Sequence, residues 1–396
     1  MSTGTQSLLR TRGSHDSGRV GMVELFFDLV FVFAVTQISH SLLAHLDSTG
    51  AWRAGFMLLA VWWVWIYTSW VTNWLNPEAP AVRLCLFALM LAGLVLSAAL
   101  PKAFAEHGVF FGVAYVAMQV GRTAFMVWAL RKGPASLRIN FVRILVWLLL
   151  SGTFWIAGSV SEDNQRVAWW CLALGLEIVS PWLYFWVPGL GRSRTTDWDV
   201  DGNHLAERCA LFVIIALGES LLVTGATFSG LPELNPRNAL AFVAAFVGSV
   251  AMWWVYFDSG AERAHHRIVH SDDPGRQARL AYTYCHVPIV AGIIVCAVAD
   301  ELVLVHPDHA SNAGIAAILG GPAIYLVGNA MFKWVTNDRI IPPLSHLVGL
   351  ALLAALAWPA FAHAFSALQL GLLTTVVMVL VATWETAALR RPAKPS

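Results

Sequence analysis

Charged side chains stand at the start of two long apolar stretches of this sequence. Glu24 and Asp28 lie in the run VELFFDLVFVFAV and are four residues apart, which places both carboxylates on one face of a helix. A second apolar stretch opens with His204, Glu207 and Arg208. Carboxylates, an imidazole and a guanidinium at such positions can transfer protons or hold small ions.

Glu219 is the residue on which we expect the chemistry to depend most. It lies about 18 Å deeper than Glu207 in a helix that rises ~1.5 Å per residue, near the midplane of a bilayer. Gly218 and Ser220 flank it, and small residues let a backbone or a ligand approach closely. Because no basic residue is near in the sequence, its carboxyl group is predicted to be protonated, to bond a partner on another helix, or to lie in a water-filled cavity.

Three further candidates, Arg122, Asp258 and His286, also lie in apolar stretches. With a cytoplasmic N-terminus they fall in the cytoplasmic half of their spans, together with Asp28, Glu207 and Arg208, and can converge in one layer. The alternative is that Arg122 and Arg208 only form buried ion pairs with these acids and orient the helices. His286 is equally well interpreted as a hydrogen-bonded core histidine.

The composition requires a membrane setting for these groups. The chain has 396 residues, of which 58% are hydrophobic and 12% charged, and its mean hydropathy is +0.64, too apolar for a soluble domain. A net charge of +1 gives no reason to expect nucleic acid as a partner. No phosphate loop, HExxH, GxSxG or CxxC motif is present, so neither an enzyme class, a cofactor nor a metal site is indicated.

The fold class predicted is all-α, a polytopic bundle of about twelve transmembrane helices. A span needs roughly 20 mostly apolar residues, and such segments lie at 22–44, 52–74, 81–101, 107–131, 138–160, 166–187, 205–229, 238–259, 277–305, 312–335, 340–363 and 366–388. Ten or eleven spans result if the last pairs are re-entrant. Lys and Arg concentrate in the loops of one side, which predicts that both termini are cytoplasmic.

The two halves of the chain resemble each other. Trp62-Trp63-Val64 corresponds to Trp253-Trp254-Val255, and two later Arg-containing pairs recur in the same order. We therefore predict a tail over 1–21, a first six-helix repeat over 22–187, a cytoplasmic linker over 188–204, a second repeat over 205–388 and a tail over 389–396. Two parallel repeats predict a polar site between them. The linker carries Asp197, Asp199 and Asp201, which we interpret as solvated rather than as a divalent-ion site.

Four motif-like stretches combine polar residues with long apolar runs: Val23 to His40, His204 to Ser220, Trp253 to Asp258, and His286 to Gly292. Together they resemble the motifs of the bacterial low temperature requirement A (LtrA) family. The resemblance implies a multi-pass protein of the bacterial plasma membrane and adds weight to Glu24 and the other polar members of these motifs. More loosely, an acidic FxD motif opening the first of six spans is similar to the lysosomal potassium channels, although the arginine and serine of that signature are absent around Phe27-Asp28.

Three functions remain open at this point. The first is an ion- or proton-linked transporter or channel, in which Glu219 or Asp28 binds the ion. The second is a membrane-embedded enzyme acting on a lipid-like or hydrophobic substrate, with the acids and His286 as general acid and base. The third is a non-catalytic membrane or sensor protein. The expected partners are membrane lipid and a small ion, a proton or a hydrophobic small molecule, and a homo-oligomer is compatible with the sequence.

Overall fold

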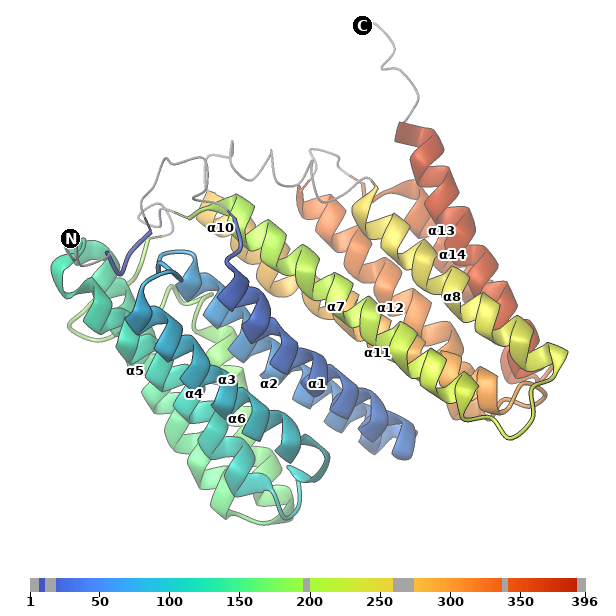
Figure 1. The fold of residues 1–396 in the computed structure, drawn as a ribbon, viewed down its shortest axis with the longest axis horizontal. Helices are drawn as coiled ribbons and strands as arrows, with labels where there is room; N and C mark the ends of the chain where they lie inside the picture. Colours follow the sequence, from blue (N-terminus) through green and yellow to red (C-terminus); the bar gives the residue numbers. More distant parts are fainter. Residues whose placement is uncertain (1–6, 11–18, 195–199, 259–273, 337–340, 390–396) are drawn as a thin grey trace, which may run out of the picture. The chain divides into compact units, whose positions relative to one another are not determined.

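Apolar segments in a bilayer must satisfy their own backbone hydrogen bonds, which favours helices. The structure, a computed structural model, describes residues 7–10, 19–194, 200–258, 274–336 and 341–389, and in these ranges it is all-helical, as predicted (Figure 1). The helices are α1 Met22–Ala44, α2 Ser48–Thr72, α3 Pro80–Ala99, α4 Gly108–Ala129, α5 Ala135–Val160, α6 Asp163–Val179, α7 Gly202–Ser229, α8 Pro236–Phe257, α10 Pro274–Ala278, α11 His286–Val305, α12 Asn312–Thr336, α13 Leu344–Phe361 and α14 Ala367–Leu389. Short 3₁₀ turns, Leu100–Lys102 and Leu130–Lys132, follow α3 and α4, and a π-helical turn, Arg279–Tyr284, precedes α11.

Eleven helices within the described ranges are long and apolar enough to cross a membrane. They correspond to eleven of the twelve predicted spans, including the last two pairs. The exception is α6, which has 17 residues and ends well before the predicted limit of 187. Pro181 explains the early end, because proline has no N–H to donate to a preceding helical turn. The following turn has positive φ values at Tyr184 and Phe185.

The first compact unit comprises residues 1–38, 57–208 and 273–276. Within it, α3 packs against α4, α4 against α5, and α5 against α6. The unit also holds α1 as far as Ile38, α2 from Met57 onward, and the first two turns of α7 as far as Arg208. The pieces of α1 and α7 carry five of the emphasised residues: Glu24, Asp28, His204, Glu207 and Arg208.

The second compact unit comprises residues 39–56, 209–272 and 277–396. Here α11 packs against α12, α8 packs against α14, and α13 contacts both α12 and α14. The approach of α11 to α12 is close: a Cβ atom on Gly292 would lie 2.5 Å from the backbone nitrogen of Tyr325, and one on Gly321 would lie 2.8 Å from that of Cys296. Glycine at these positions lets the two helix backbones touch.

The predicted duplication and the predicted cytoplasmic position of both termini stay predictions.

Local capping accounts for several helix starts. Asn235 accepts hydrogen bonds from the backbone N–H groups of Arg237 and Asn238 at the start of α8, where Pro236 occupies the first helical position. Both choices are those that a helix N-terminus favours.

Candidate functional site

Glu24 is the most heavily bonded residue of a buried polar centre in the first unit. Its side chain is fully buried and lies in the first turn of α1, where one oxygen, Oε2, accepts the N–H of Gly21 at 2.8 Å. This is the return bond of a capping box, which holds a glutamate at the third helical position. The same oxygen accepts Nη2 of Arg10 at 2.7 Å, while Oε1 faces Nε2 of His204 at 2.8 Å and Nη1 of Arg208 at 3.3 Å.

Asp28 lies one turn further along α1 and is also fully buried. Its Oδ1 accepts two hydrogen bonds, from Nη2 of Arg208 at 2.6 Å and from the indole N–H of Trp65 at 2.7 Å. Its other oxygen, Oδ2, has no hydrogen-bond partner among the described residues, and neither has Nε of Arg208. The Arg208 guanidinium lies 5.6 Å from the centroid of the Trp65 ring, within range of a cation–π interaction.

His204 connects the centre to the end of α2. Its Nε2 lies 2.8 Å from Oε1 of Glu24 and 3.2 Å from Nη2 of Arg10, and its Nδ1 lies 3.4 Å from the amide nitrogen of Asn73. Because the carboxylate is the nearest of these groups and can only accept, Nε2 is assigned as the N–H that donates to Glu24 and Nδ1 as the acceptor. Asn73 also exchanges two hydrogen bonds with the backbone of Asp201. The Asp201 carboxylate in turn caps α7 by accepting the N–H groups of Asn203 and His204.

Arg10, from the segment before α1, links Glu24 to the end of α2. Its Nε donates to the carbonyl oxygens of Thr72 and Leu75, both at 3.0 Å. These carbonyls lie at the C-terminal end of α2, where carbonyl groups lack helical partners and attract cations. Two arginines, two carboxylates and one neutral imidazole therefore meet at this site, and their formal charges balance.

A second polar cluster in the same unit contains Arg122. It donates to the carbonyl oxygen of Val64 and the hydroxyl of Thr68 on α2, and to Oε1 of Gln119 on α4. The amide nitrogen of Gln119 donates to Glu177 at 2.7 Å, so the amide bridges a guanidinium and a carboxylate that do not touch. Glu177 also accepts bonds from the three side chains of Tyr115, Ser151 and Trp155. Arg122 thus does not pair with Asp28, Glu207 or Asp258, as the ion-pair alternative proposed.

Besides Arg122, four predicted site residues lie outside the buried charge centre, which is formed by Glu24, Asp28, His204 and Arg208 together with Arg10. Glu207 is exposed and accepts the backbone N–H of Val20 at 3.1 Å. Asp258 follows the last residue of α8, is exposed, and accepts the hydroxyl of Thr386 at 2.6 Å. His286 is fully buried and hydrogen-bonded to Tyr256, which is the arrangement of a core histidine.

Glu219 has 7% of its surface exposed, and none of the hydrogen bonds between described residues involves its carboxylate. It belongs to the second unit, as do Asp258 and His286, whereas Glu207 and the buried charge centre belong to the first. Of the six residues predicted to converge, Asp28 and Arg208 meet, and Glu24 and His204 join them. Asp197 and Asp199, considered for an ion site, lie outside the described residues.

Comparison with known proteins places the chain within a family. The model of the bacterial low temperature requirement A protein (LtrA) matches residues 19–383, which includes both α1 and the start of α7. The chain belongs to the LtrA family. An uncharacterized protein of Rhizobium meliloti (strain 1021) is 44% identical over 377 residues, covering 95% of this chain and 91% of that protein. No solved structure matches the chain.

The LtrA match covers the two motifs that supply the centre, one with Glu24 and Asp28 and one with His204 and Arg208. Sequence reasoning missed the other members of this site. Arg10 stands before the matched region, in a segment predicted as a tail, and Asn73 carries no signal beyond its place at the end of an apolar run. Trp65 was not among the candidate residues, yet its indole N–H donates to Asp28.

Proposed function

We propose that this LtrA-family membrane protein is an ion- or proton-linked transporter or channel, and that Asp28 is the group that binds and releases the proton. The observation that carries the proposal is the buried centre of Glu24, Asp28, His204 and Arg208 in otherwise apolar helices. Buried ion pairs are often no more stabilising than apolar side chains of the same size. Ionisable groups inside membrane spans accordingly mark ion and proton pathways more often than they add stability.

The two carboxylates have different surroundings, which separates their roles. Glu24 contacts two guanidinium groups and an imidazole N–H and is thereby held in its ionised form. Among the described residues, Asp28 contacts a single cation, Arg208, which it shares with Glu24, and its Oδ2 has no hydrogen-bond partner. When two titratable groups have environments that differ in this way, the less compensated one is the group suited to exchange a proton. Asp28 thus supplies the protonatable site, and Glu24 fixes Arg10 and Arg208.

Protonation of Asp28 has a mechanical consequence in this geometry. The neutral carboxyl no longer balances Arg208, so the guanidinium is left with Glu24 at 3.3 Å as its ionic partner. An uncompensated buried charge is costly, and the centre lowers that cost by moving Arg208 towards Glu24 or towards an incoming anion. Because Arg208 lies in the second turn of α7, a movement of its guanidinium group would displace the start of this long helix.

The test is cation and proton flux in proteoliposomes that hold a trapped pH indicator. Acid-loaded vesicles containing the wild-type chain receive pulses of NaCl or KCl, and a valinomycin-clamped potential tests electrogenic proton entry. We expect wild-type flux above that of empty vesicles and a loss of at least tenfold in Asp28→Asn. The matched control is Glu106→Gln, which removes one carboxylate from an exposed pair with Lys102 and should leave flux unchanged.

Two results would refute the proposal. One is an absence of wild-type flux for protons, Na⁺ and K⁺ under every gradient. The other is equal flux in wild type and in Asp28→Asn, with both proteins folded as judged by their far-UV circular dichroism. The first result would favour a non-transporting role in which the charges only fix the helices.

A further inference from the structure

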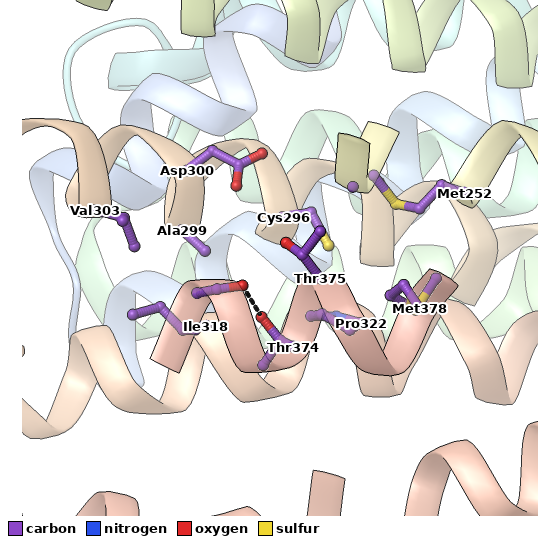
Figure 2. Close-up of a pocket in the computed structure, with 12 residues that line it drawn as sticks. Met252, Cys296, Ala299, Asp300, Val303, Ile318, Pro322, Thr374, Thr375 and Met378 are labelled. Carbon is purple, nitrogen blue, oxygen red and sulfur yellow. Dashed lines mark hydrogen bonds between the residues drawn. The ribbon is translucent and has the colours of Figure 1, made fainter. Parts of the chain in front are cut away.

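The second unit contains a small cavity that the sequence analysis did not anticipate. It measures about 40 Å³ and lies among four helices, α8, α11, α12 and α14. Figure 2 shows the side chains around it, with Asp300 from α11 and Thr374 and Thr375 from α14. Asp300 is five residues before the end of α11, about 8 Å along a helix that rises ~1.5 Å per residue. Its carboxylate is therefore inside the span and next to a cavity.

Asp300 has no ionic partner within the described part of the chain. None of the hydrogen bonds there involves its carboxylate, and the residues lining the cavity include no lysine, arginine or histidine. A carboxylate at this depth must be neutralised, paired or wetted. The cavity provides the space for whatever neutralises it.

The other polar groups of the cavity are oriented as acceptors. The hydroxyl of Thr374 donates its hydrogen to the carbonyl of Gly371 at 2.9 Å, the dashed line in Figure 2. The hydroxyl of Thr375 donates to the carbonyl of Ala244 at 3.4 Å. With each hydrogen engaged, the lone pairs of both oxygens remain available. Such a lining suits a cation and is unfavourable for an anion.

Pro322 leaves one backbone carbonyl of α12 without its usual helical donor. It lies inside α12 and has no N–H, so the carbonyl of Ile318, four residues earlier, receives no helical hydrogen bond from it. Ile318 and Pro322 both line the cavity. Carbonyl oxygens released from a helix by an interruption are a recurrent source of ligands for Na⁺ in membrane proteins.

We infer that the cavity beside Asp300 is a binding site for one small monovalent cation of the Na⁺ class. One carboxylate balances one positive charge, whereas a divalent ion would leave an uncompensated charge in the membrane. The volume allows an ion with one or two waters, given ~10–15 Å³ for each water-sized probe. The inference goes beyond the proposed function, because equilibrium binding here requires neither flux nor Asp28.

The experiment is thermal unfolding of the purified full chain against NaCl, with choline chloride keeping the ionic strength constant. A ligand that binds only the folded state raises the Tm in a concentration-dependent way. We expect saturable stabilisation by Na⁺ in wild type and an apparent Kd at least tenfold higher in Asp300→Asn. Glu301→Gln is the matched control: it removes the neighbouring carboxylate of α11, which does not line the cavity, and should leave the Kd unchanged.

A second variant keeps the inference testable if Asp300→Asn does not fold. Pro322→Ala restores the N–H that bonds the Ile318 carbonyl, leaves the carboxylate in place, and should raise the apparent Kd for Na⁺ severalfold. The inference is overturned if Na⁺ gives no saturable stabilisation of wild type, or if its Kd is the same in Asp300→Asn. It is also overturned if only pH, and no cation, shifts the Tm in an Asp300-dependent way, since the site then takes a proton. Flux measured separately distinguishes each of these outcomes from failure of the proposed function.

Discussion

Replacing Arg208 with glutamine removes the cation that contacts both carboxylates of the buried charge centre. In the wild type its two terminal nitrogens lie 2.6 Å from Asp28 and 3.3 Å from Glu24, and all three side chains are fully buried. The substitution leaves Asp28 with the Trp65 indole as its hydrogen-bond donor. Removal of one partner from a buried ion pair destabilises proteins by about 3–5 kcal/mol. Because glutamine keeps part of the volume and one donor group, we expect a loss near the lower end of that range.

The assay is equilibrium unfolding of purified protein in mixed micelles, followed by tryptophan fluorescence. Lys102→Gln serves as the control, because Lys102 pairs with Glu106 at the surface, with 59% and 70% of the side chains exposed. Exposed pairs contribute little, so this variant should unfold like the wild type. A double-mutant cycle of Arg208→Gln with Asp28→Asn should yield a coupling energy of roughly 0.5–3 kcal/mol, as contacting residues do.

Two outcomes contradict this reasoning. If Arg208→Gln unfolds at the same denaturant concentration as Lys102→Gln, the guanidinium is not a buried partner of the acids. If the cycle gives purely additive effects, Arg208 and Asp28 are not in direct contact. Either result would remove the geometric basis of the proposed proton-binding role, whatever the flux experiments show.

Two further predictions concern the second unit. Gly292→Ala should lower the free energy of unfolding by about 1–3 kcal/mol, because the added Cβ would meet Tyr325 and overpacking against backbone is poorly tolerated. The control is Gly320→Ala, whose Cβ would meet nothing within 4 Å and which should raise the free energy of unfolding by roughly 0.5–1 kcal/mol. Equal effects of the two variants in chemical unfolding would disprove the close contact. Lys333→Met should lower the Tm by leaving Glu385 without the ammonium group that lies 2.7 Å away. The double variant with Glu385→Met should recover most of the loss, since a buried pair can be replaced by apolar side chains; a double variant as unstable as the single one would argue against the pairing.

Much of the architecture follows from the distribution of apolar residues. The predicted first span, 22–44, coincides with α1, and the spans at 312–335 and 366–388 agree with α12 and α14 to within one residue. Such agreement is expected because long apolar runs in a bilayer have little choice but to form helices. The sixth span was predicted too long because hydropathy alone carried it past Pro181.

The charge centre was predictable where the signal was local. Glu24 and Asp28 share a helical face by their spacing, and pairing of Asp28 with Arg208 was one of the arrangements considered. Arg10 and Asn73 were not predictable, because nothing in a polar tail or at the end of an apolar run indicates contact with His204. Asp300 is similar: near the end of its span it resembles an ordinary headgroup-level carboxylate. Its interest arises only because α12 and α14 bring a proline and two threonines to the same cavity.

The contact between α11 and α12 limits how the second unit can deform. Gly292 lies against Tyr325, and one turn further along α11, Cys296 lies against Gly321. Because each of these contacts has a glycine on one side and backbone on the other, a shift of α11 along α12 would bring backbone atoms into collision. Asp300, Ile318 and Pro322 all belong to this closely packed pair of helices. A solute can therefore enter the cavity beside them only past α8 and α14, which form its other wall. These two helices are joined by the 3.4 Å hydrogen bond from the hydroxyl of Thr375 to the carbonyl of Ala244. Exchange of a cation at this cavity would therefore require α8 and α14 to move away from α11 and α12, rather than α11 to move along α12.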